Sequence, residues 1–528
     1  MELTEKGQKT VKAIRNAVIF IVLLVVGYFA YTRWVSKDGK LAVDSKSGKP
    51  DLIVAYNTFT GVEGLVLMNG GMEPNDNSTL YKNYGIKLLI KQMDAVKDTR
   101  AGLHSGDLDL VYCTTDALSV EMGSGSELLA DNVVQIMQVN QSHGADAIVV
   151  RKGIDDVENL KHKKVAYAVG TASHTLLLNV LESSGLKMSD IDGYQVGDGV
   201  EAANAFKNNQ CDAAVVWAPD DEDCVASQPG AKVLVSSAVA SQIIADGLLV
   251  KQSVLKDKHD RIVKLVKAWL QGNARINNDP TAKKEANSLF AKGFKFPEDI
   301  AAKSANKVYF STLGDNINFF GLNSTYTGMT GDRMYGRMAI KYTEVGLAKS
   351  PSPWRNVSDP SVIQELMNDK VFTADNKQVA AKVESFKPAT NEMKTQTSQS
   401  SKIISLEFPT NSARLNEDDK VLIDREIKEL AQGFAGAYIR VEGNTDNVGS
   451  VDVNNKLSIN RATAVVYYLV NEHKFDQNKF IIVGNGSKKP VAGCEDNQDD
   501  ACRAKNRRTE FQFIWKAPSI SGGGNGGD

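Results

Sequence analysis

An aspartate and an arginine near the carboxyl terminus have side chains and a spacing suited to binding a zwitterion. Thr445 and Asp446 follow a short apolar run that is typical of a strand, so we expect them in a loop at its carboxyl end. Arg461 lies on or beside the apolar stripe of the helix predicted to follow. A carboxylate can bind an ammonium group, and a guanidinium fork can bind a carboxylate. On the spacing alone, a purely structural Asp–Arg ion pair is the more common arrangement.

The helix that must position Arg461 is predicted from apolar residues that recur with a helical period. These residues are Leu457, Ala464, Val465, Tyr468 and Leu469. An acid at a strand end and an arginine one turn into the next helix can face each other.

Several separated motifs around this pair resemble the OmpA-like peptidoglycan-binding domain. They are Thr445, Asp446 and Gly449; Asn454, Leu457, Ser458, Arg461, Ala462 and Val465; Gly484, Gly486 and Pro490; and Asn506, Arg507 and Arg508. The likeness covers residues 402–515 and implies an α+β domain that binds the diaminopimelate stem peptide of peptidoglycan non-covalently, with Asp446 and Arg461 as the main charged clamps. The resemblance assigns peptidoglycan binding to Thr445, Asp446, Asn454, Leu457, Arg461 and Arg507. Asn444 departs from the family pattern, in which many members carry His or Tyr, and leaves the rim of the pocket undefined.

The composition describes an ordinary globular chain of two to four domains. It has 528 residues, 42% of them hydrophobic, and a net charge of −2, which gives no support for nucleic-acid binding. Five cysteines are too few for a disulfide scaffold. Cys494 and Cys502 bracket a polar loop that a disulfide would hold closed, and Cys211 with Cys224 could form a second one, which leaves Cys113 unpaired.

An apolar stretch at the amino terminus predicts a single membrane span. Residues 13–35 have transmembrane length if the flanking arginines reach the interfaces, and the basic residues before them predict a cytoplasmic tail at 1–12. A cleaved signal peptide is the rival interpretation, but Tyr28 would suit signal peptidase poorly at the −3 position. The span contains no Asp or Glu, whereas ion-driven stator subunits, which share this layout, carry an acid there. Anchoring in the inner membrane, with the bulk of the chain in the periplasm, is therefore the prediction.

The rest of the chain alternates between predicted strands and helices, which indicates an α/β fold with a mostly parallel sheet. We expect linkers at 36–50 and 386–401, a main domain at 51–385, the carboxyl-terminal domain at 402–515 and a disordered tail at 516–528. Residues 310–347 are rich in Gly, Asn, Tyr and Met and have no chemistry that we could assign.

The segments 149–186 and 199–220 are similar to the periplasmic substrate-binding proteins of the nitrate, sulfonate and taurine class. With IVAYNTFTGVEGLVL and AGLHSGDLDLVYCTTDAL before them, the likeness spans residues 51–323. It implies two α/β lobes that are joined by a hinge and close on a ligand. Ligands of such sheets bind at the carboxyl ends of the strands.

The predicted solute site consists of residues that directly follow strands. They are Asn57, Thr58, Thr114, Thr115, Asp116, Thr171, Ser173, His174, Trp217 and Asp220. Residues 170–174 open a helix and could form an anion site, although a simple helix cap by Thr171 or Ser173 fits the sequence equally well. Asp116 and Asp220 would repel an oxoanion, which favours a solute with a positive end. An anionic or zwitterionic small solute is the predicted ligand class.

No enzymatic motif is present: the chain lacks a Walker A loop, HExxH, G-x-S-x-G and a cysteine pair at zinc-ligand spacing. We therefore expect no catalysis, no cofactor and no metal. The sequence predicts an inner-membrane-anchored periplasmic protein that binds a solute and peptidoglycan and acts as a tether or sensor. Two alternatives remain open: the binding component of an ABC importer localised to the cell wall, and a stator-like or scaffold subunit that works with a membrane-protein partner.

Overall fold

The computed structural model describes residues 49–381, 385–406, 408 and 412–515. The predicted tail at 1–12 and membrane span at 13–35 lie outside these residues, as does the predicted tail at 516–528. Within the described ranges, no helix has both the length and the apolar character needed to span a membrane. The anchor therefore stays a prediction.

The first lobe contains a six-stranded sheet with the strand order β11-β4-β10-β3-β1-β2. Its strands are β1 (Leu52–Tyr56), β2 (Leu88–Gln92), β3 (Leu110–Thr114), β4 (Val133–Ser142), β10 (Ala245–Lys251) and β11 (Val308–Phe310). β1 pairs in parallel with β2 and β3, whereas β10 is antiparallel to both β3 and β4. The expectation of a mostly parallel sheet was wrong here, because β10 returns from the second lobe in the opposite direction.

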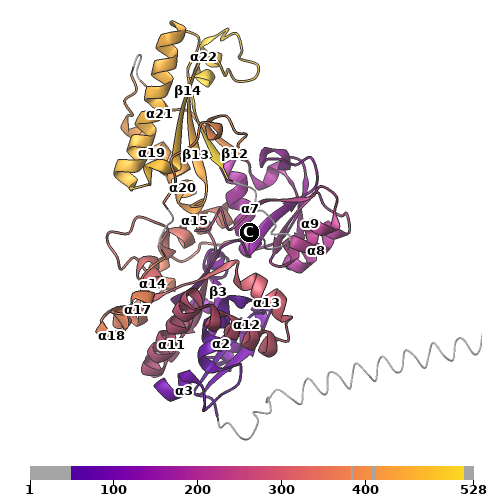
Figure 1. Cartoon of the computed structure of the whole chain (residues 1–528), viewed down its shortest axis with the longest axis vertical. Coiled ribbons are helices and arrows are strands. Elements are labelled where there is room, and N and C mark those ends of the chain that lie inside the picture. The colour runs from indigo at the N-terminus through magenta and orange to yellow at the C-terminus, as the bar shows by residue number, and fades with distance from the viewer. Residues whose placement is uncertain (1–48, 382–384, 407, 409–411, 516–528) are drawn as a thin grey trace, which may run out of the picture. The chain divides into compact units, whose positions relative to one another are not determined.

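Helices cover this sheet, and one of them supplies much of the core (Figure 1). The helices before the second lobe are α2 (Glu63–Asn69), α3 (Thr79–Tyr84), α4 (Val96–Ser105), α5 (Leu118–Glu121) and α6 (Glu127–Ala130); those after it are α10 (Gln252–Asp257), α11 (His259–Asn278), α12 (Pro280–Phe294) and α13 (Glu298–Ala305). α11 is amphipathic and directs Trp269, which is fully buried, into the core together with Leu265 and Leu270.

The second lobe contains a five-stranded sheet with the order β7-β6-β8-β5-β9. Its elements are β5 (Asp146–Val150), β6 (Lys164–Ala168), α7 (Ala172–Ser183), β7 (Asp192–Val196), α8 (Gly199–Lys207), β8 (Ala213–Trp217), α9 (Asp220–Ser227) and β9 (Lys232–Ser236). The chain enters this lobe between β4 and β5 and leaves it between β9 and β10. These two crossovers form the hinge that the resemblance predicted.

A helical segment follows β11 and returns to the first lobe. It comprises α14 (Leu313–Phe319), α15 (Gly331–Glu344), α16 (Trp354–Val357), α17 (Ser361–Met367) and α18 (Lys370–Thr373). α15 begins after Thr330, whose side chain accepts a hydrogen bond from the Arg333 backbone N–H. Its buried face carries Met334, Tyr335, Met338 and Tyr342.

The carboxyl-terminal domain contains a four-stranded sheet with the order β12-β15-β13-β14. Its elements are β12 (Ser400–Ile404), α19 (Glu417–Ile423), a π-helical turn η6 (Asp424–Lys428), α20 (Glu429–Gly433), β13 (Tyr438–Asn444), α21 (Val451–His473), β14 (Phe480–Gly486), α22 (Asp500–Asn506) and β15 (Thr509–Ile514). β13 is parallel to β14 and antiparallel to β15, and α21 packs on both β13 and β14.

The segment predicted as a free linker, 386–401, is held against this domain. The Arg440 guanidinium donates hydrogen bonds to the carbonyls of Met393 (3.1 Å) and Gln396 (2.7 Å). The Phe386 ring packs edge-on against Tyr438, with 4.8 Å between the ring centroids. Many residues of this segment are exposed, but these contacts hold it against the domain, so the linker stays a prediction.

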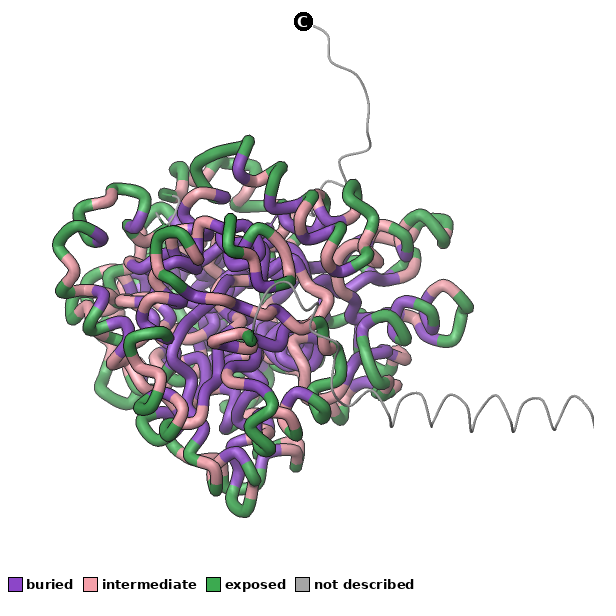
Figure 2. Tube along the Cα trace, turned by 90° about the horizontal axis from the view of Figure 1, so that it is seen from below, coloured by how far each residue is buried: buried purple, intermediate pink, exposed green. Residues whose placement is uncertain are grey.

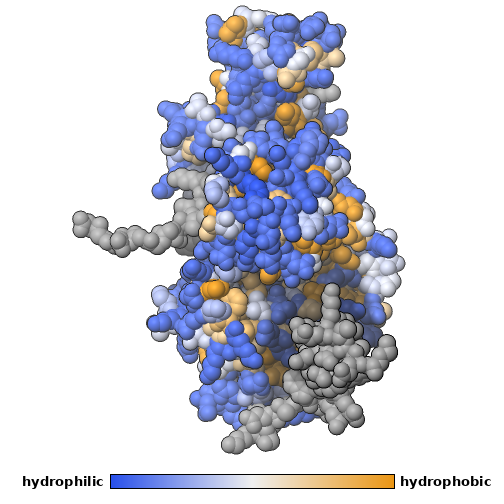
Figure 3. All heavy atoms as spheres, turned by 90° about the vertical axis from the view of Figure 1, so that its right-hand side faces the viewer, coloured by the Kyte–Doolittle hydropathy of each residue, from blue (hydrophilic) through white to orange (hydrophobic). Residues whose placement is uncertain are grey.

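Buried residues gather in the interior of the molecule, whereas exposed residues lie on its outer turns (Figure 2). The face seen in Figure 3 is mostly hydrophilic, with scattered apolar residues. One core cluster contains residues from the second lobe, such as Leu234 and Ile243, together with Phe434, Phe513 and Trp515 of the carboxyl-terminal domain. The two modules therefore share apolar packing.

Candidate functional site

The Asp446 carboxylate lies at the carboxyl end of β13, as predicted, and forms a direct ion pair with Arg507. Arg507 Nη1 lies 2.7 Å from Asp446 Oδ2. The Val448 backbone N–H donates to the other carboxylate oxygen, at 3.1 Å. The sequence had proposed Arg461 as the facing partner, so the structure assigns the direct contact to a different arginine.

Arg461 lies beside this pair and is largely buried. Its Nε donates to the Ser412 carbonyl at 3.2 Å, and its guanidinium lies 4.8 Å from the centroid of the Phe408 ring. Burial lowers the pKa of Arg461; the nearby Asp446 carboxylate raises this pKa, and the positive charge of Arg507 lowers it. Among the described residues, Nη1 and Nη2 of Arg461 have no hydrogen-bond partner. Two guanidinium groups and one carboxylate thus converge at this edge of the sheet.

Local hydrogen bonds set the position of the loop that carries Asp446. Asn454 Nδ2 donates to the carbonyls of Asp446 (3.3 Å) and Val448 (3.1 Å). Thr445 is buried, and its hydroxyl also donates to the Asp446 carbonyl, at 2.9 Å. Leu457 is half-buried one turn further along α21. Asn454 and Thr445 therefore orient the loop.

The disulfide between Cys494 and Cys502 is present, with sulfur atoms 2.09 Å apart, which confirms the predicted pairing. Asn506 Nδ2 donates to the Cys494 carbonyl at 2.9 Å, so the closed loop is tied to the residue that precedes Arg507. Cys211 and Cys224 are free and buried, as is Cys113. A second bridge between Cys211 and Cys224 was a wrong prediction, since the Cys224 thiol donates instead to a backbone carbonyl of α8, that of Ala203.

The residues predicted to bind a solute lie at strand ends, but several are fully buried. Thr115, Asp116, Ser173 and His174 are buried, whereas the others are partly buried: Asn57, Thr58, Thr114, Thr171, Trp217 and Asp220. Several of them have partners within the chain. Thr58 donates twice to the Asp94 carboxylate, at 2.6 and 3.0 Å. Asp220 Oδ1 lies 4.0 Å from Lys207 Nζ, and the Trp217 ring packs against Gly199.

Tyr342 of α15 packs against the predicted anion site at the start of α7. Its hydroxyl lies 2.8 Å from Thr175 Oγ1 and donates to the Thr171 carbonyl at 3.2 Å, and its ring packs edge-on against His174. The Thr171 side chain caps α7 by accepting from the Ser173 backbone N–H at 3.2 Å. Thr171 therefore serves as a helix cap, as the alternative interpretation predicted. Side chains of the same chain pack around this end of α7.

Burial favours the neutral forms of Asp116 and His174. Burial raises the pKa of Asp116 to about 8, and its Oδ1 accepts a hydrogen bond from the Ala245 backbone N–H at 3.3 Å. Burial lowers the pKa of His174 to about 4. The argument that an Asp116 carboxylate would repel an oxoanion therefore fails, because this carboxyl group is mostly protonated.

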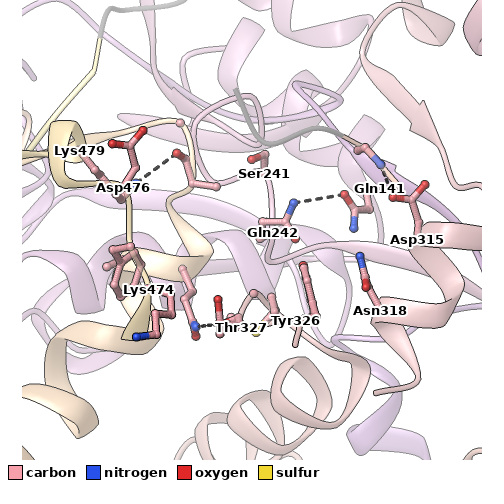
Figure 4. Close-up of a pocket in the computed structure, with 18 of the residues that line it drawn as sticks. Gln141, Ser241, Gln242, Asp315, Asn318, Tyr326, Thr327, Lys474, Asp476 and Lys479 are labelled. Carbon is pink, nitrogen blue, oxygen red and sulfur yellow. Dashed lines mark hydrogen bonds between the residues drawn. The ribbon is translucent and has the colours of Figure 1, made fainter. Parts of the chain in front are cut away.

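A larger cavity, of about 1200 Å³, lies at the hinge (Figure 4). Its lining includes Gln141, His143 and Gln242 from the two crossovers and Lys474 and Lys479 from the carboxyl-terminal domain. None of the predicted solute-binding residues lines it. The sequence carried no signal for this cavity, because its walls come from segments that only the tertiary structure brings together.

The fold and the clamp describe a chain that joins an α/β domain of the periplasmic-binding-protein type to an OmpA-type domain. Residues 77–283 match the family model described as NMT1/THI5 like, and residues 407–507 match the OmpA family. These matches bear out both sequence resemblances at the level of the domains.

The sequence relatives include an outer membrane protein and a putative binding protein. Outer membrane protein Omp38 of Acinetobacter baumannii is 35% identical over 101 residues, which cover 19% of this chain and 27% of that protein. A putative binding protein of Brucella abortus is 29% identical over 117 residues, covering 22% of this chain and 34% of that protein. The chain thus spans only about a third or less of the length of these relatives.

Solved structures align with the two-lobed region. The periplasmic aliphatic sulphonate binding protein of Escherichia coli has a TM-score of 0.47 and 19% identity, covering 60% of this chain and all of that protein. The periplasmic nitrate-binding protein of Synechocystis has a TM-score of 0.43 and 12% identity, covering 60% of this chain and 86% of that protein.

Proposed function

We propose that this protein is an envelope protein that binds peptidoglycan through its carboxyl-terminal domain and works as a tether without turnover. The observation that carries the proposal is the convergence of Asp446, Arg461 and Arg507 at the carboxyl end of β13. The OmpA family match over residues 407–507 and the outer-membrane relatives support this location and ligand.

The charge arrangement suits the zwitterionic end of a diaminopimelate stem peptide. The Asp446 carboxylate would bind the ammonium group, and the guanidinium groups of Arg461 and Arg507 would bind the carboxylate. Arg507 pairs with Asp446, which limits the cost of leaving a partly buried carboxylate uncompensated. The predicted inner-membrane anchor at 13–35 would fix the other end of the tether.

Sedimentation with purified sacculi tests the clamp. Asp446→Ala and Arg461→Ala should each weaken binding at least tenfold, because truncating one partner of a buried charged contact costs about 2–5 kcal/mol. The affinity should also fall as salt is added, since part of the site is open to solvent.

Matched surface variants control for changes in net charge. Asp452→Ala removes an exposed acid from the first turn of α21, and Arg425→Ala removes an exposed arginine. Both should sediment like the wild-type protein. Unchanged sedimentation of Asp446→Ala and Arg461→Ala would remove the clamp assignment.

A second candidate concerns the two-lobed module, which we propose serves as a scaffold rather than an open solute receptor. The packing of Tyr342 against Thr171 and Thr175 favours this role, because it closes the place where the fold class would receive a solute. Delivery of a solute to an ABC importer would require α15 to move first. The NMT1/THI5-like match is compatible with a module that binds a solute and with one that serves as a scaffold.

A further inference from the structure

The cavity at the hinge is large enough for a ligand of several rings. Its volume of about 1200 Å³ exceeds that of a typical small-molecule site, which is about 300–1000 Å³. In Figure 4, Lys474, Asp476 and Lys479 stand on one side, Asp315 and Asn318 on the other, and Gln242 between them. Three parts of the chain therefore meet around one space: the first lobe, the hinge and the carboxyl-terminal domain.

Neutral polar groups contribute a large share of the walls. The amide and hydroxyl side chains include those of Gln141, Ser241, Gln242, Asn318, Thr327 and Gln432. Among the described residues, Gln242 Oε1 and Gln432 Oε1 have no hydrogen-bond partner. The amide nitrogen of Gln242 donates to Gln141 Oε1, and that of Gln432 donates to the Thr327 carbonyl. An unpartnered buried acceptor costs about 1–3 kcal/mol, so both would gain from a donor in the cavity after a small rotation of the amide.

The acids that border the cavity are already satisfied within the chain. The Asp315 carboxylate accepts from the Tyr309 hydroxyl at 2.9 Å and from the Ala381 backbone N–H at 2.7 Å. The Asp476 carboxylate accepts from the backbone N–H groups of Phe386 and Asn478. Neither acid needs a cationic ligand.

The basic groups are satisfied in the same way, apart from the exposed Lys387. Lys479 Nζ donates to three backbone carbonyls at 2.8–3.1 Å, and Lys474 Nζ donates to the Asn471 carbonyl at 2.5 Å. His473 pairs with Asp424, and burial lowers the pKa of His143, which favours its neutral form. Hydrogen bonds within the chain therefore occupy most of these charged groups, whereas the amide oxygens of Gln242 and Gln432 stay free among the described residues.

Aromatic rings supply the apolar part of the lining. Tyr309 stacks with His143, with 5.7 Å between the ring centroids, and Tyr326 and Tyr438 also border the space. Aromatic faces beside amides and hydroxyls suit a ligand that carries both C–H faces and many hydroxyl groups.

From this lining we infer that the hinge cavity is a binding site for a neutral saccharide. Its hydroxyl and N-acetyl groups would donate to the free oxygens of Gln242 and Gln432, and its ring faces would pack on the tyrosines. The ligand would touch both lobe crossovers and the end of α21, so it would bridge the two modules.

This site is separate from the stem-peptide clamp. Asp446 precedes the amino end of α21 and Arg461 lies near its middle, whereas the cavity lies at its carboxyl end. The 12 helical steps from Arg461 to His473, at about 1.5 Å each, place Arg461 roughly 18 Å from that end. Two sources could supply the saccharide: free sugars, and the glycan strand of the wall.

Isothermal titration with the full chain tests the inference and separates the sources. The probes are maltose, N,N′-diacetylchitobiose, and wall glycan from which the stem peptides have been removed by an amidase. Binding of maltose and diacetylchitobiose indicates free sugars as the source, whereas binding confined to the N-acetylated probes indicates wall glycan.

Gln242→Met and Gln432→Met keep the side-chain length and remove the amide oxygens. Each should weaken saccharide binding at least tenfold while sedimentation with sacculi through the stem-peptide clamp persists. Gln364→Met, on an exposed face of α17 away from the cavity, is the matched control and should bind like the wild-type protein. Thermal melting of each variant verifies that it is folded.

Three results would overturn the inference. One is the absence of binding by all three probes at millimolar concentration. Another is tighter binding of a neutral N-acetylated tripeptide amide, which would make the site a peptide site. The third is wild-type affinity in folded Gln242→Met and Gln432→Met.

Discussion

At the residue scale, burial controls the charge of three aspartates near the junction of the lobes. It raises the pKa of Asp116 to about 8, of Asp146 to about 7 and of Asp246 to about 6. Each of the last two has hydroxyl or amide donors, from Ser142 for Asp146 and from Tyr56 and Asn140 for Asp246. These carboxyl groups act as polar core residues.

Asp116→Asn should make stability depend less on pH. The pKa of Asp116 is higher in the folded than in the unfolded state, so its contribution to stability is complete below about pH 4 and is lost as the pH rises through about 8. Between about pH 4 and pH 8, the free energy of unfolding of the wild-type protein should therefore fall by more than about 1 kcal/mol relative to that of the variant. Urea unfolding at pH 4, 6 and 8 measures the difference.

Asp257→Asn controls for the loss of a carboxylate, because Asp257 is exposed. Its unfolding should follow the wild-type pH profile. An Asp116→Asn profile parallel to the wild-type one would show that Asp116 ionises normally.

At the element scale, α15 packs on α7, and the proposed scaffold role depends on this contact. Tyr342 packs on the start of α7, and Met338 contacts Asn179 on the same helix. Arg337 and Lys341 of α15 form ion pairs with Glu182, which also lies on α7. Helix α15, which belongs to the segment that returns to the first lobe, is therefore held against the second lobe through α7.

Tyr342→Ala should uncover a solute site that the wild-type protein lacks. We expect no thermal shift of the wild-type protein with amino acids, sulfonates or oxoanions at millimolar concentration. In the variant, the start of α7 and the unpartnered Ser173 hydroxyl become accessible, so an oxoanion or sulfonate should raise the melting temperature by a few degrees. Differential scanning fluorimetry measures both.

Tyr335→Ala is the matched control, since Tyr335 is buried on the same helix but bonds to the Ser352 carbonyl. It should lose stability without gaining a ligand response. A shift of several degrees in the wild-type protein would instead establish an open solute site and end the scaffold hypothesis.

At the scale of the whole molecule, the second lobe and the carboxyl-terminal domain share one interface. Trp515 Nε1 donates to the Leu234 carbonyl at 3.1 Å, and the hydroxyls of Ser183 and Ser400 lie 2.6 Å apart. The Gln242 backbone N–H donates to the Gly433 carbonyl at 3.2 Å. Such contacts predict that the two modules unfold together.

Trp515→Ala should uncouple them. Replacing a buried tryptophan by alanine lowers the free energy of unfolding by about 3–5 kcal/mol. Trp515 is buried at the interface, so its loss should weaken the contact between the two modules. Calorimetry should show one shared transition for these modules in the wild-type protein and two separated transitions in the variant.

Trp354→Ala, in the first lobe, is the control for general destabilisation. It should lower the first-lobe transition and leave the coupling of the other two modules intact. A single transition in Trp515→Ala, shifted as a whole, would contradict the interface.

Local patterns were enough to identify the features that depend on nearby residues. The alternation of strands and helices in the main domain was predicted, and the polar loop between Cys494 and Cys502 predicted their disulfide. The motif order around Asp446 predicted a charged site that includes Arg461 and Arg507, and the structure brings these side chains near Asp446. These features depend on strand and helix periodicity and on short-range geometry, which the sequence itself records.

Only the tertiary structure decided which distant residues meet. It paired Asp446 with Arg507 across 61 positions and brought Tyr342 to Thr171 across 171 positions. It also enclosed the hinge cavity and docked the segment predicted as a linker. No periodicity encodes such contacts, because they depend on how sheets and helices pack once formed, and burial then sets the protonation of groups such as Asp116. The sequence by itself thus determined the modules and their order, whereas packing decided which distant residues meet.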